Sequence, residues 1–253
     1  MTETKKSTAM NTQTADLLYP PSRKVVDSET IQRMASRCTD YNDSRSDARN
    51  FKCVEIRNAV FSGEDFCGIE THYSKFADCE FENCKLSRME AMFSSWENCI
   101  FRNCEIENAD YSFAHLNNVQ FLNCNLNGTD FPFAKGNFNA VECMMSHCTA
   151  QNANLQLQFS SVNASGFEAN FAHIELAEVT LSNFRRSEFN DGVISGKFDK
   201  TDLTNSEFNR SELSGLAITD CATSGMDTED AVGVDDKALE DAIRELEEDS
   251  WDD

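Results

Sequence analysis

Several features are scarce in this chain of 253 residues. It has only three Pro, two Trp and four Tyr, and its longest apolar runs are a few residues long. Because a membrane-spanning helix needs about 20 mostly apolar residues, we expect no membrane span. The segment Met1 to Leu18 has no basic start followed by an apolar block, so a cleaved secretory signal is not expected either. These absences predict a cytoplasmic protein.

Basic residues are also few. The chain has 22 Lys and Arg against 44 Asp and Glu, a net charge of −22. Residues 51–225 carry 12 basic and 24 acidic side chains, and residues 226–253 carry two basic and 13 acidic. A chain this acidic repels nucleic acid and attracts basic surfaces. We therefore expect a basic protein surface as the partner, and no direct binding of nucleic acid.

Motifs for catalysis are missing as well. The sequence has no phosphate-binding loop of the P-loop or dinucleotide type, and no nucleophile elbow. The four histidines do not pair with a motif-spaced Cys, Asp or Ser: His72, His115, His147 and His173. The sequence therefore predicts a protein that is not an enzyme and needs no cofactor.

Cysteine is abundant, but its pattern does not indicate a disulfide framework. Eleven Cys, an odd number, in a chain without a signal peptide indicate free thiols in a reducing compartment. Three pairs have the outermost spacing of zinc ligands: Cys79/Cys84, Cys99/Cys104 and Cys143/Cys148. They fall on a repeat position that otherwise holds small apolar residues, where Cys packs as a small apolar side chain. We interpret them as packing residues rather than metal ligands.

Phenylalanine is the common aromatic, with 19 copies, and it marks a repeat. From Phe51 a large apolar residue recurs every five positions, and two residues before most of them sits a small one such as Cys79 or Ala109. A helix face needs a period of 3.6 and a strand face a period of two. A five-residue unit with two inward side chains fits one side of a square coil, so four such units complete one turn.

The 20-residue period is also visible by itself. One set of positions is always Phe and a second is always Asn or Asp: Phe61, Phe81, Phe101, Phe121; Asn58, Asp78, Asn98, Asn118. Neighbouring coils would stack at the strand spacing of about 4.8 Å. The Phe side chains would then form an internal column. The Asn side chains would form a ladder at a corner, where Asn suits the turn backbone.

In these residues the chain resembles the pentapeptide-repeat family, whose motif is small–Asp/Asn–Leu/Phe–x–x. The resemblance covers roughly two-thirds of the chain, from Phe51 to about Ile218. It implies an all-β fold, a right-handed quadrilateral β-helix with short capping helices, which we assign to residues 51–225. The five-residue frame of the repeat shifts near residues 136–142, 156–163, 182–186 and 195–197. We interpret the slips as bulges or small loops, and a loop there would be either a binding element or a tolerated insertion.

The N-terminal end lacks the repeat. Residues 1–26 are rich in Ser and Thr without periodicity, which predicts disorder. Asp27 or Ser28 could cap a short helix within residues 27–50, and that helix would cover the open end of the first coil.

The C-terminal end, residues 226–253, is an acidic tail. Asp235 or Asp236 could cap a short helix with Leu239 and Ile243 on one face. This apolar face would cover the last coil or pair with a second copy. The resemblance implies the second alternative, because related gyrase-protecting members form homodimers through their C-terminal ends, but this tail is more acidic and less apolar than such a contact suggests, and both alternatives stay open.

One set of acidic residues recurs at 20-residue intervals on the same side of every coil: Glu70, Glu90, Asp110 and Asp130. In the coil they would form a column of carboxylates about 4.8 Å apart. Like charges stacked across strands destabilise each other. We therefore consider these four residues the candidate partner-binding site. The alternative is structural, because Asp or Asn at this position also favours the turn and belongs to the family motif.

The family resemblance also implies a function. A regular acidic rod resembles duplex DNA, and some pentapeptide-repeat proteins act in this way on DNA gyrase and topoisomerase IV, among them quinolone-resistance proteins and the microcin B17 immunity protein. The stretches 76–84 and 101–104 look like the Cys-rich coils of the immunity group. The alternative function is a secreted bacterial effector or interaction scaffold, for which Met1 to Thr14 would be an uncleaved secretion signal rather than plain disorder.

Overall fold

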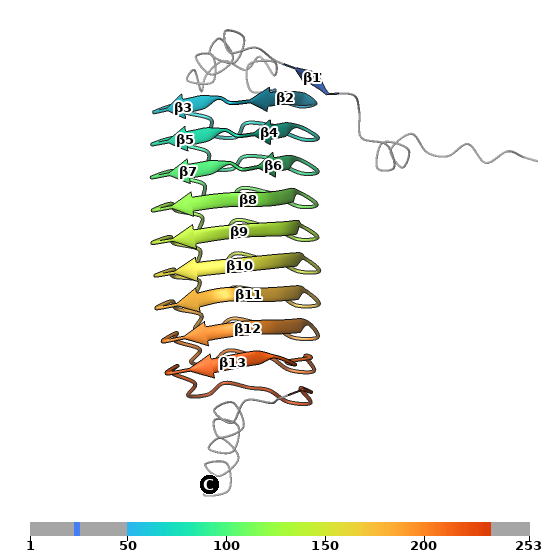
Figure 1. The fold of residues 1–253 in the computed structure, drawn as a ribbon, viewed down its shortest axis with the longest axis vertical. Coiled ribbons are helices and arrows are strands. Elements are labelled where there is room, and N and C mark those ends of the chain that lie inside the picture. The colour runs from blue at the N-terminus through green and yellow to red at the C-terminus, as the bar shows by residue number, and fades with distance from the viewer. Residues whose placement is uncertain (1–22, 26–49, 234–253) are drawn as a thin grey trace, which may run out of the picture.

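The computed structural model describes residues 23–25 and 50–233. Thirteen parallel strands are described, stacked one coil above another along a rod (Figure 1). In chain order they are β1 (Lys24–Val25), β2 (Val54–Arg57), β3 (Val60–Ser62), β4 (Lys75–Ala77), β5 (Glu80–Glu82), β6 (Ser95–Glu97), β7 (Ile100–Arg102), β8 (His115–Leu122), β9 (Lys135–Val141), β10 (Asn154–Ser160), β11 (His173–Thr180), β12 (Val193–Asp199) and β13 (Leu216–Thr219). The coil is right-handed, as parallel crossovers are.

Each coil has four sides. In the first coils two sides are separate strands, β4 and β5 for example, and from β8 onward they merge, because β8 pairs with both β6 and β7. Single parallel bridges hold the other two sides, such as Lys85 with Glu105 and Glu90 with Asp110. The all-β quadrilateral β-helix expected from the repeat is therefore confirmed.

The corners explain the five-residue period. One coil turns at Phe93, Asn98, Asn103 and Asn108, five positions apart, and all four have left-handed backbones with φ between 51° and 58°. Asn adopts this conformation more easily than most residues, because its short polar side chain can bond locally. Three of the four corners in this coil thus carry the expected residue type, and the fourth carries Phe.

The predicted internal column is confirmed. Rings of Phe61, Phe81, Phe101 and Phe121 stack in successive coils with centroids 4.8, 4.7 and 5.1 Å apart. The predicted corner ladder is present as well: Asn98 Nδ2 donates to Asp78 at 2.9 Å, and Asn118 Nδ2 donates to Asn98 at 3.0 Å. The hydrophobic core therefore runs through the rod as a continuous stack.

The three cysteine pairs point inward, as the packing interpretation predicts. All six side chains are buried. The Cys84 thiol donates to the Phe61 carbonyl of the preceding coil at 3.5 Å, and the Cys104 thiol makes the same contact with Phe81 at 3.4 Å. Burial raises the pKa of the Cys148 thiol to about 12. Within residues 23–25 and 50–233, no three His, Cys, Asp or Glu side chains converge in a way that could hold a metal ion.

The slips of frame near residues 136–142 and 195–197 are bulges inside strands rather than loops, whereas the slip near 182–186 lies between β11 and β12, outside the strands. Leu116 of β8 pairs with Gly136, but Val119 pairs with Phe138, so the coil becomes one residue shorter at this point. Gly136 has φ 115°, and a Cβ there would lie 1.7 Å from the Leu116 carbonyl oxygen. Similar shifts occur between β10 and β11 and between β11 and β12.

The ends of the chain are described only in part. β1 lies within the segment 1–26 that the sequence predicts to be disordered, yet Lys24 and Val25 pair in parallel with β2. The rest of that segment, both expected capping helices and the expected C-terminal dimer contact fall in residues 1–22, 26–49 and 234–253, outside the described residues. No helix in the described part of the chain is long and apolar enough to span a bilayer.

Candidate partner-binding surface

The four carboxylates singled out in the sequence lie one above another. Glu70 bridges to Glu90, Glu90 to Asp110 and Asp110 to Asp130. Backbone hydrogen bonds fix the spacing: Thr71 N donates to Glu90 O at 2.7 Å, and Glu90 N donates to Ile69 O at 2.8 Å. All four side chains lie at the surface, with Glu90 the most open. The backbone thus aligns four like charges on one side of the rod.

The column continues further than the sequence predicts. Below Asp130 the same bridge position is occupied by Thr149, Glu168, Glu188, Glu207 and Asp227. We call the eight carboxylates together the acidic column. Eight coil steps at about 4.8 Å give it a length of about 38 Å.

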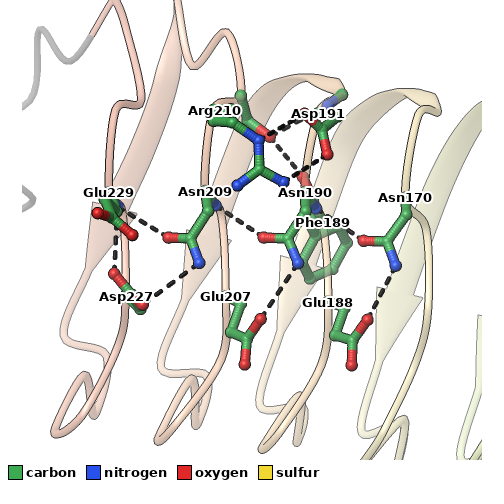
Figure 2. A network of polar contacts seen from close by, with 12 residues as sticks. Asn170, Glu188, Phe189, Asn190, Asp191, Glu207, Asn209, Arg210, Asp227 and Glu229 are labelled. Atoms are coloured by element: carbon green, nitrogen blue, oxygen red, sulfur yellow. Dashed lines mark hydrogen bonds and ion pairs between the residues drawn. The ribbon is translucent and has the colours of Figure 1, made fainter.

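In the lower half of the column, a row of asparagine amides runs beside the row of carboxylates (Figure 2). Asn170, Asn190 and Asn209, the amide ladder, follow their carboxylates by two residues. Asn170 Nδ2 donates to Glu188 at 2.8 Å, and its Oδ1 accepts from the Asn190 backbone at 2.9 Å. The other two amides repeat this pattern in the next coils. Each amide therefore supplies a donor to a carboxylate that would otherwise face mainly like charge.

The upper half has no such amide ladder. At the equivalent positions lie His72, Met92, Ser112 and Pro132. Glu70 forms an ion pair with Lys52, and the Glu90 carboxylate lies 3.0 Å from His72 Nε2.

The two aspartates of the upper half bond locally. Asp110 Oδ1 accepts from the backbone of Ser112 at 2.8 Å, and Asp130 Oδ1 accepts from Thr149 Oγ1 at 2.7 Å. This local bonding is what the structural alternative predicts for Asp at this position. Both aspartates are nevertheless only half-buried, so part of each side chain remains accessible to a partner.

Beside the upper half lies a second column that the sequence analysis missed. Tyr73, Phe93, Phe113 and Phe133 each follow a column carboxylate by three residues and occupy one corner of four successive coils. Their rings stack on the outside of the rod with centroids 5.1, 4.8 and 4.8 Å apart and interplanar angles of 5°, 12° and 2°. We call them the outer aromatic ladder. Phe113 and Phe133 are 39% and 44% exposed.

The rod thus combines four five-residue sides per coil with left-handed corners and an inner aromatic column. This chain folds as a quadrilateral β-helix, the fold of pentapeptide-repeat proteins. No family model matches the chain, and no curated protein matches it.

Solved structures of similar fold include HetL, a pentapeptide repeat protein involved in heterocyst differentiation regulation from the cyanobacterium Nostoc sp. strain PCC 7120. It is 14% identical, over 74% of this chain and 90% of that chain, with a TM-score of 0.32. QnrB1, a plasmid-mediated fluoroquinolone resistance protein, is 18% identical in its full-length form over 76% and 99%, with a TM-score of 0.34. A trypsin-treated variant is 15% identical over 78% and 91%, with a TM-score of 0.40. These similarities concern the fold alone.

The corner that carries the outer aromatic ladder holds other residue types in the lower coils of the β-helix. There it holds Asn152, then Phe171, which is 62% exposed, and then Asp191 and Arg210. Arg210 donates to the Asp191 carboxylate at 2.7 and 2.8 Å, which lowers the pKa of that carboxyl. The lower corner thus mixes Asn152, a lone exposed Phe171 and the paired Asp191 and Arg210, whereas the upper corner is a continuous aromatic strip.

Aromatic residues are not required at this corner by the backbone. The other corners of the pentapeptide-repeat β-helix mostly hold Asn, Asp or Gly, at Asn98, Asn103 and Gly128 for example. A left-handed backbone is unfavourable for a bulky side chain by about 1–2 kcal/mol per residue. Stacking of neighbouring rings returns about 0.5–1.5 kcal/mol per pair. The ladder has four such corners but only three ring pairs, so the cost of about 4–8 kcal/mol exceeds the gain of about 1.5–4.5 kcal/mol and the fold itself is not stabilised by the ladder.

Proposed function

We propose that this protein acts by binding rather than by catalysis, and that its acidic column occupies a basic groove of a DNA-binding protein in place of duplex DNA. DNA gyrase or topoisomerase IV is the proposed partner, and protection of that enzyme against an inhibitor or toxin is the proposed outcome. The partner follows from the resemblance of the repeats to the gyrase-protecting group. The mode of binding follows from the charge and shape of the rod.

The observation that carries this proposal is the continuity of the acidic column. Its carboxylates succeed one another over about 38 Å with a single break at Thr149. Duplex DNA of that length carries on the order of 22 charges. Residues 51–225 carry 24 acidic and 12 basic side chains, so their net charge is about half that of the DNA. A rod of this charge is attracted to basic grooves that hold DNA.

The electrostatic repulsion within the acidic column supports a functional role. Carboxylates one coil apart repel each other, and cross-strand pairs of like charge destabilise a sheet. The equivalent positions on a neighbouring side show that the fold does not need a single sign, because Asp65, Lys85, Glu105 and Asn125 form the same kind of bridge. The acidic column therefore keeps an unfavourable arrangement that a mixed column would avoid.

The test is supercoiling by purified gyrase in the presence of the full chain. We expect the wild-type protein to change the activity in a way that weakens with added salt, because screening reduces attraction between exposed charges. Reversing two charges, Glu90→Lys with Asp110→Lys, should abolish the effect. The matched control reverses two exposed acidic residues on other sides, Glu80→Lys with Glu105→Lys, which gives the same net charge.

Equal loss of effect in the control would show that net charge acts alone, without the column. No effect of the wild-type chain on gyrase or on topoisomerase IV would remove these enzymes as partners.

A further inference from the structure

We propose that the outer aromatic ladder and the upper carboxylates form one docking strip for a basic amphipathic helix of the partner. Apolar side chains of that helix would lie on Tyr73, Phe93, Phe113 and Phe133. Its lysine or arginine side chains would lie on Glu70, Glu90, Asp110 and Asp130. The inference rests on the proposed function in one respect, that the partner is a basic protein.

The two halves of the strip are close enough to be covered by one helix. Each ladder residue follows its carboxylate by three positions, as Phe93 follows Glu90, so their Cα atoms are at most about 10 Å apart. An α-helix with its side chains is about 10–12 Å wide. One helix can therefore place an apolar row on the rings and a basic row on the carboxylates.

The spacing along the rod also suits a helix. Successive coils are about 4.8 Å apart, and successive turns of an α-helix are about 5.4 Å apart. Over the three steps of the ladder the difference reaches only about 2 Å, which long flexible side chains can absorb. An extended strand places side chains on one face about 6.6 Å apart and would fall out of step by about 5 Å.

The orientation of the rings decides what kind of contact they offer. Rings of Phe93, Phe113 and Phe133 are stacked nearly parallel, so each largely covers the faces of its neighbours. Their outward edges remain, and a cation prefers the face of a ring to its edge. The ladder is therefore an apolar strip rather than a series of cation sites, and the acidic column beside it supplies the attraction for charge.

A second copy of this chain is a poor occupant for the strip. Two strips packed against each other would bring carboxylates close to carboxylates, and the chain carries a net charge of −22. Like charges in contact oppose association. A basic helix supplies the complementary charge, and helices of this kind are what many DNA-binding proteins place against DNA.

The experiment uses the full chain and a fluorescein-labelled, alanine-based helical peptide with a row of leucine beside a row of lysine. Binding is followed by fluorescence anisotropy. We expect Phe93→Asn with Phe113→Asn to weaken binding about tenfold, which corresponds to a loss of about 1.4 kcal/mol of apolar contact for the two ring edges together. Asn suits the left-handed corner, as Asn98 and Asn118 demonstrate.

Three controls sharpen the result. Phe171→Asn removes an exposed ring from the same corner outside the ladder and should leave binding unchanged. Phe93→Leu with Phe113→Leu keeps an apolar strip and should retain most of the binding; Leu181 occupies another left-handed corner with its side chain exposed. A peptide with glutamine in place of lysine should bind weakly. Thermal melts check the folding of each variant, and the single variant Phe113→Asn, which should weaken binding by about half as many kcal/mol, serves if the Asn pair unfolds.

Unchanged binding by the Asn pair would overturn the proposal, and so would an equal loss in Phe171→Asn. A wild-type dimer in sedimentation experiments that the Asn pair dissociates would assign the ladder to self-association instead. The gyrase assay separates the two proposals. If the charge reversals abolish the effect on gyrase and the Asn pair does not, only the docking strip fails. If the ladder binds the peptide and gyrase is unaffected, only the choice of partner fails.

Discussion

Tyr111 and Phe131 stack in the core of successive coils with ring centroids 5.3 Å apart, yet only Tyr111 carries a hydroxyl there. Its Oη is buried and has no hydrogen-bond partner among the described residues. Burial also raises the pKa of this phenol well above its ordinary value. A column that accepts Phe in the next coil thus contains an unsatisfied polar atom.

We predict that Tyr111→Phe stabilises the protein. Removing a buried hydroxyl without a partner should recover about 1–2 kcal/mol of unfolding free energy. For a chain of this size the melting temperature should rise by about 2–4 °C for each kcal/mol. Thermal unfolding followed by circular dichroism measures it. Tyr73→Phe, on the surface, serves as the control and should change little; a lower melting temperature for Tyr111→Phe would contradict the prediction.

A second prediction concerns the bulge at Gly136. An added Cβ would lie 1.7 Å from the Leu116 carbonyl oxygen, and φ is 115°. Because both obstacles are backbone, Gly136→Ala should lower the unfolding free energy by at least about 3 kcal/mol. Gly63→Ala is the matched control: its φ is 69° but nothing lies within 4 Å, so only about 1 kcal/mol of backbone strain is expected. If urea denaturation gave equal losses of unfolding free energy for the two variants, the backbone around Gly136 would have moved to relieve the clash.

The amide ladder gives a third prediction. Asn190 donates to Glu207 at 3.2 Å and accepts from the Asn209 backbone at 2.8 Å. Asn190→Asp keeps the acceptor, removes the donor and adds a negative charge beside Glu207. We expect a loss of about 1–3 kcal/mol, shrinking as salt is added. Asn154→Asp, at an exposed position of β10, adds the same charge elsewhere and should be nearly neutral. A loss that does not respond to salt would argue against repulsion as its cause.

The last prediction concerns pH. Arg210 lowers the pKa of Asp191, so the pairing stabilises the folded state above the pKa of an unfolded Asp, near pH 4, and the contribution is lost as pH falls through the lower folded value. Arg210→Ala should raise the Asp191 pKa towards that of a free Asp. Carbon-13 NMR of the carboxyl follows the titration. Arg57→Ala, whose guanidinium pairs with Glu55, should leave Asp191 unchanged.

Sequence patterns predicted the upper coils well because the 20-residue period is strict between Phe61 and Phe121. Each position then has a fixed partner above and below, so the inner Phe column, the Asn corner and the upper carboxylates could all be derived from spacing. Backbone bridges between Glu90 and Asp110 confirm this stacking.

The lower carboxylates could not be found in the same way. Several coils lose one residue at a bulge, so the steps from Asp130 down to Glu168 and from Glu188 to Glu207 are shorter than the 20-residue period. A search at 20-residue intervals that starts from Asp130 therefore does not find them. The amide ladder depends on them and was missed for the same reason.

The outer aromatic ladder was within reach of the sequence. Tyr73, Phe93, Phe113 and Phe133 recur at 20-residue intervals. They were overlooked because the repeat already accounts for aromatic residues as inward side chains, and outward corner positions are not expected to hold large rings. An aromatic residue at a corner position is therefore the signal to search for in such repeats.

The bulges at Gly136 and Gly196 lie in the merged strands, on the part of the coil away from the acidic column. Changes of coil length are thus absorbed there, and Thr149 still bridges directly to Glu168 across a shortened coil. The carboxylate side and the strand side can accordingly vary independently. Duplicating or deleting a whole coil would change how far the charged side reaches while leaving its repeat distance the same.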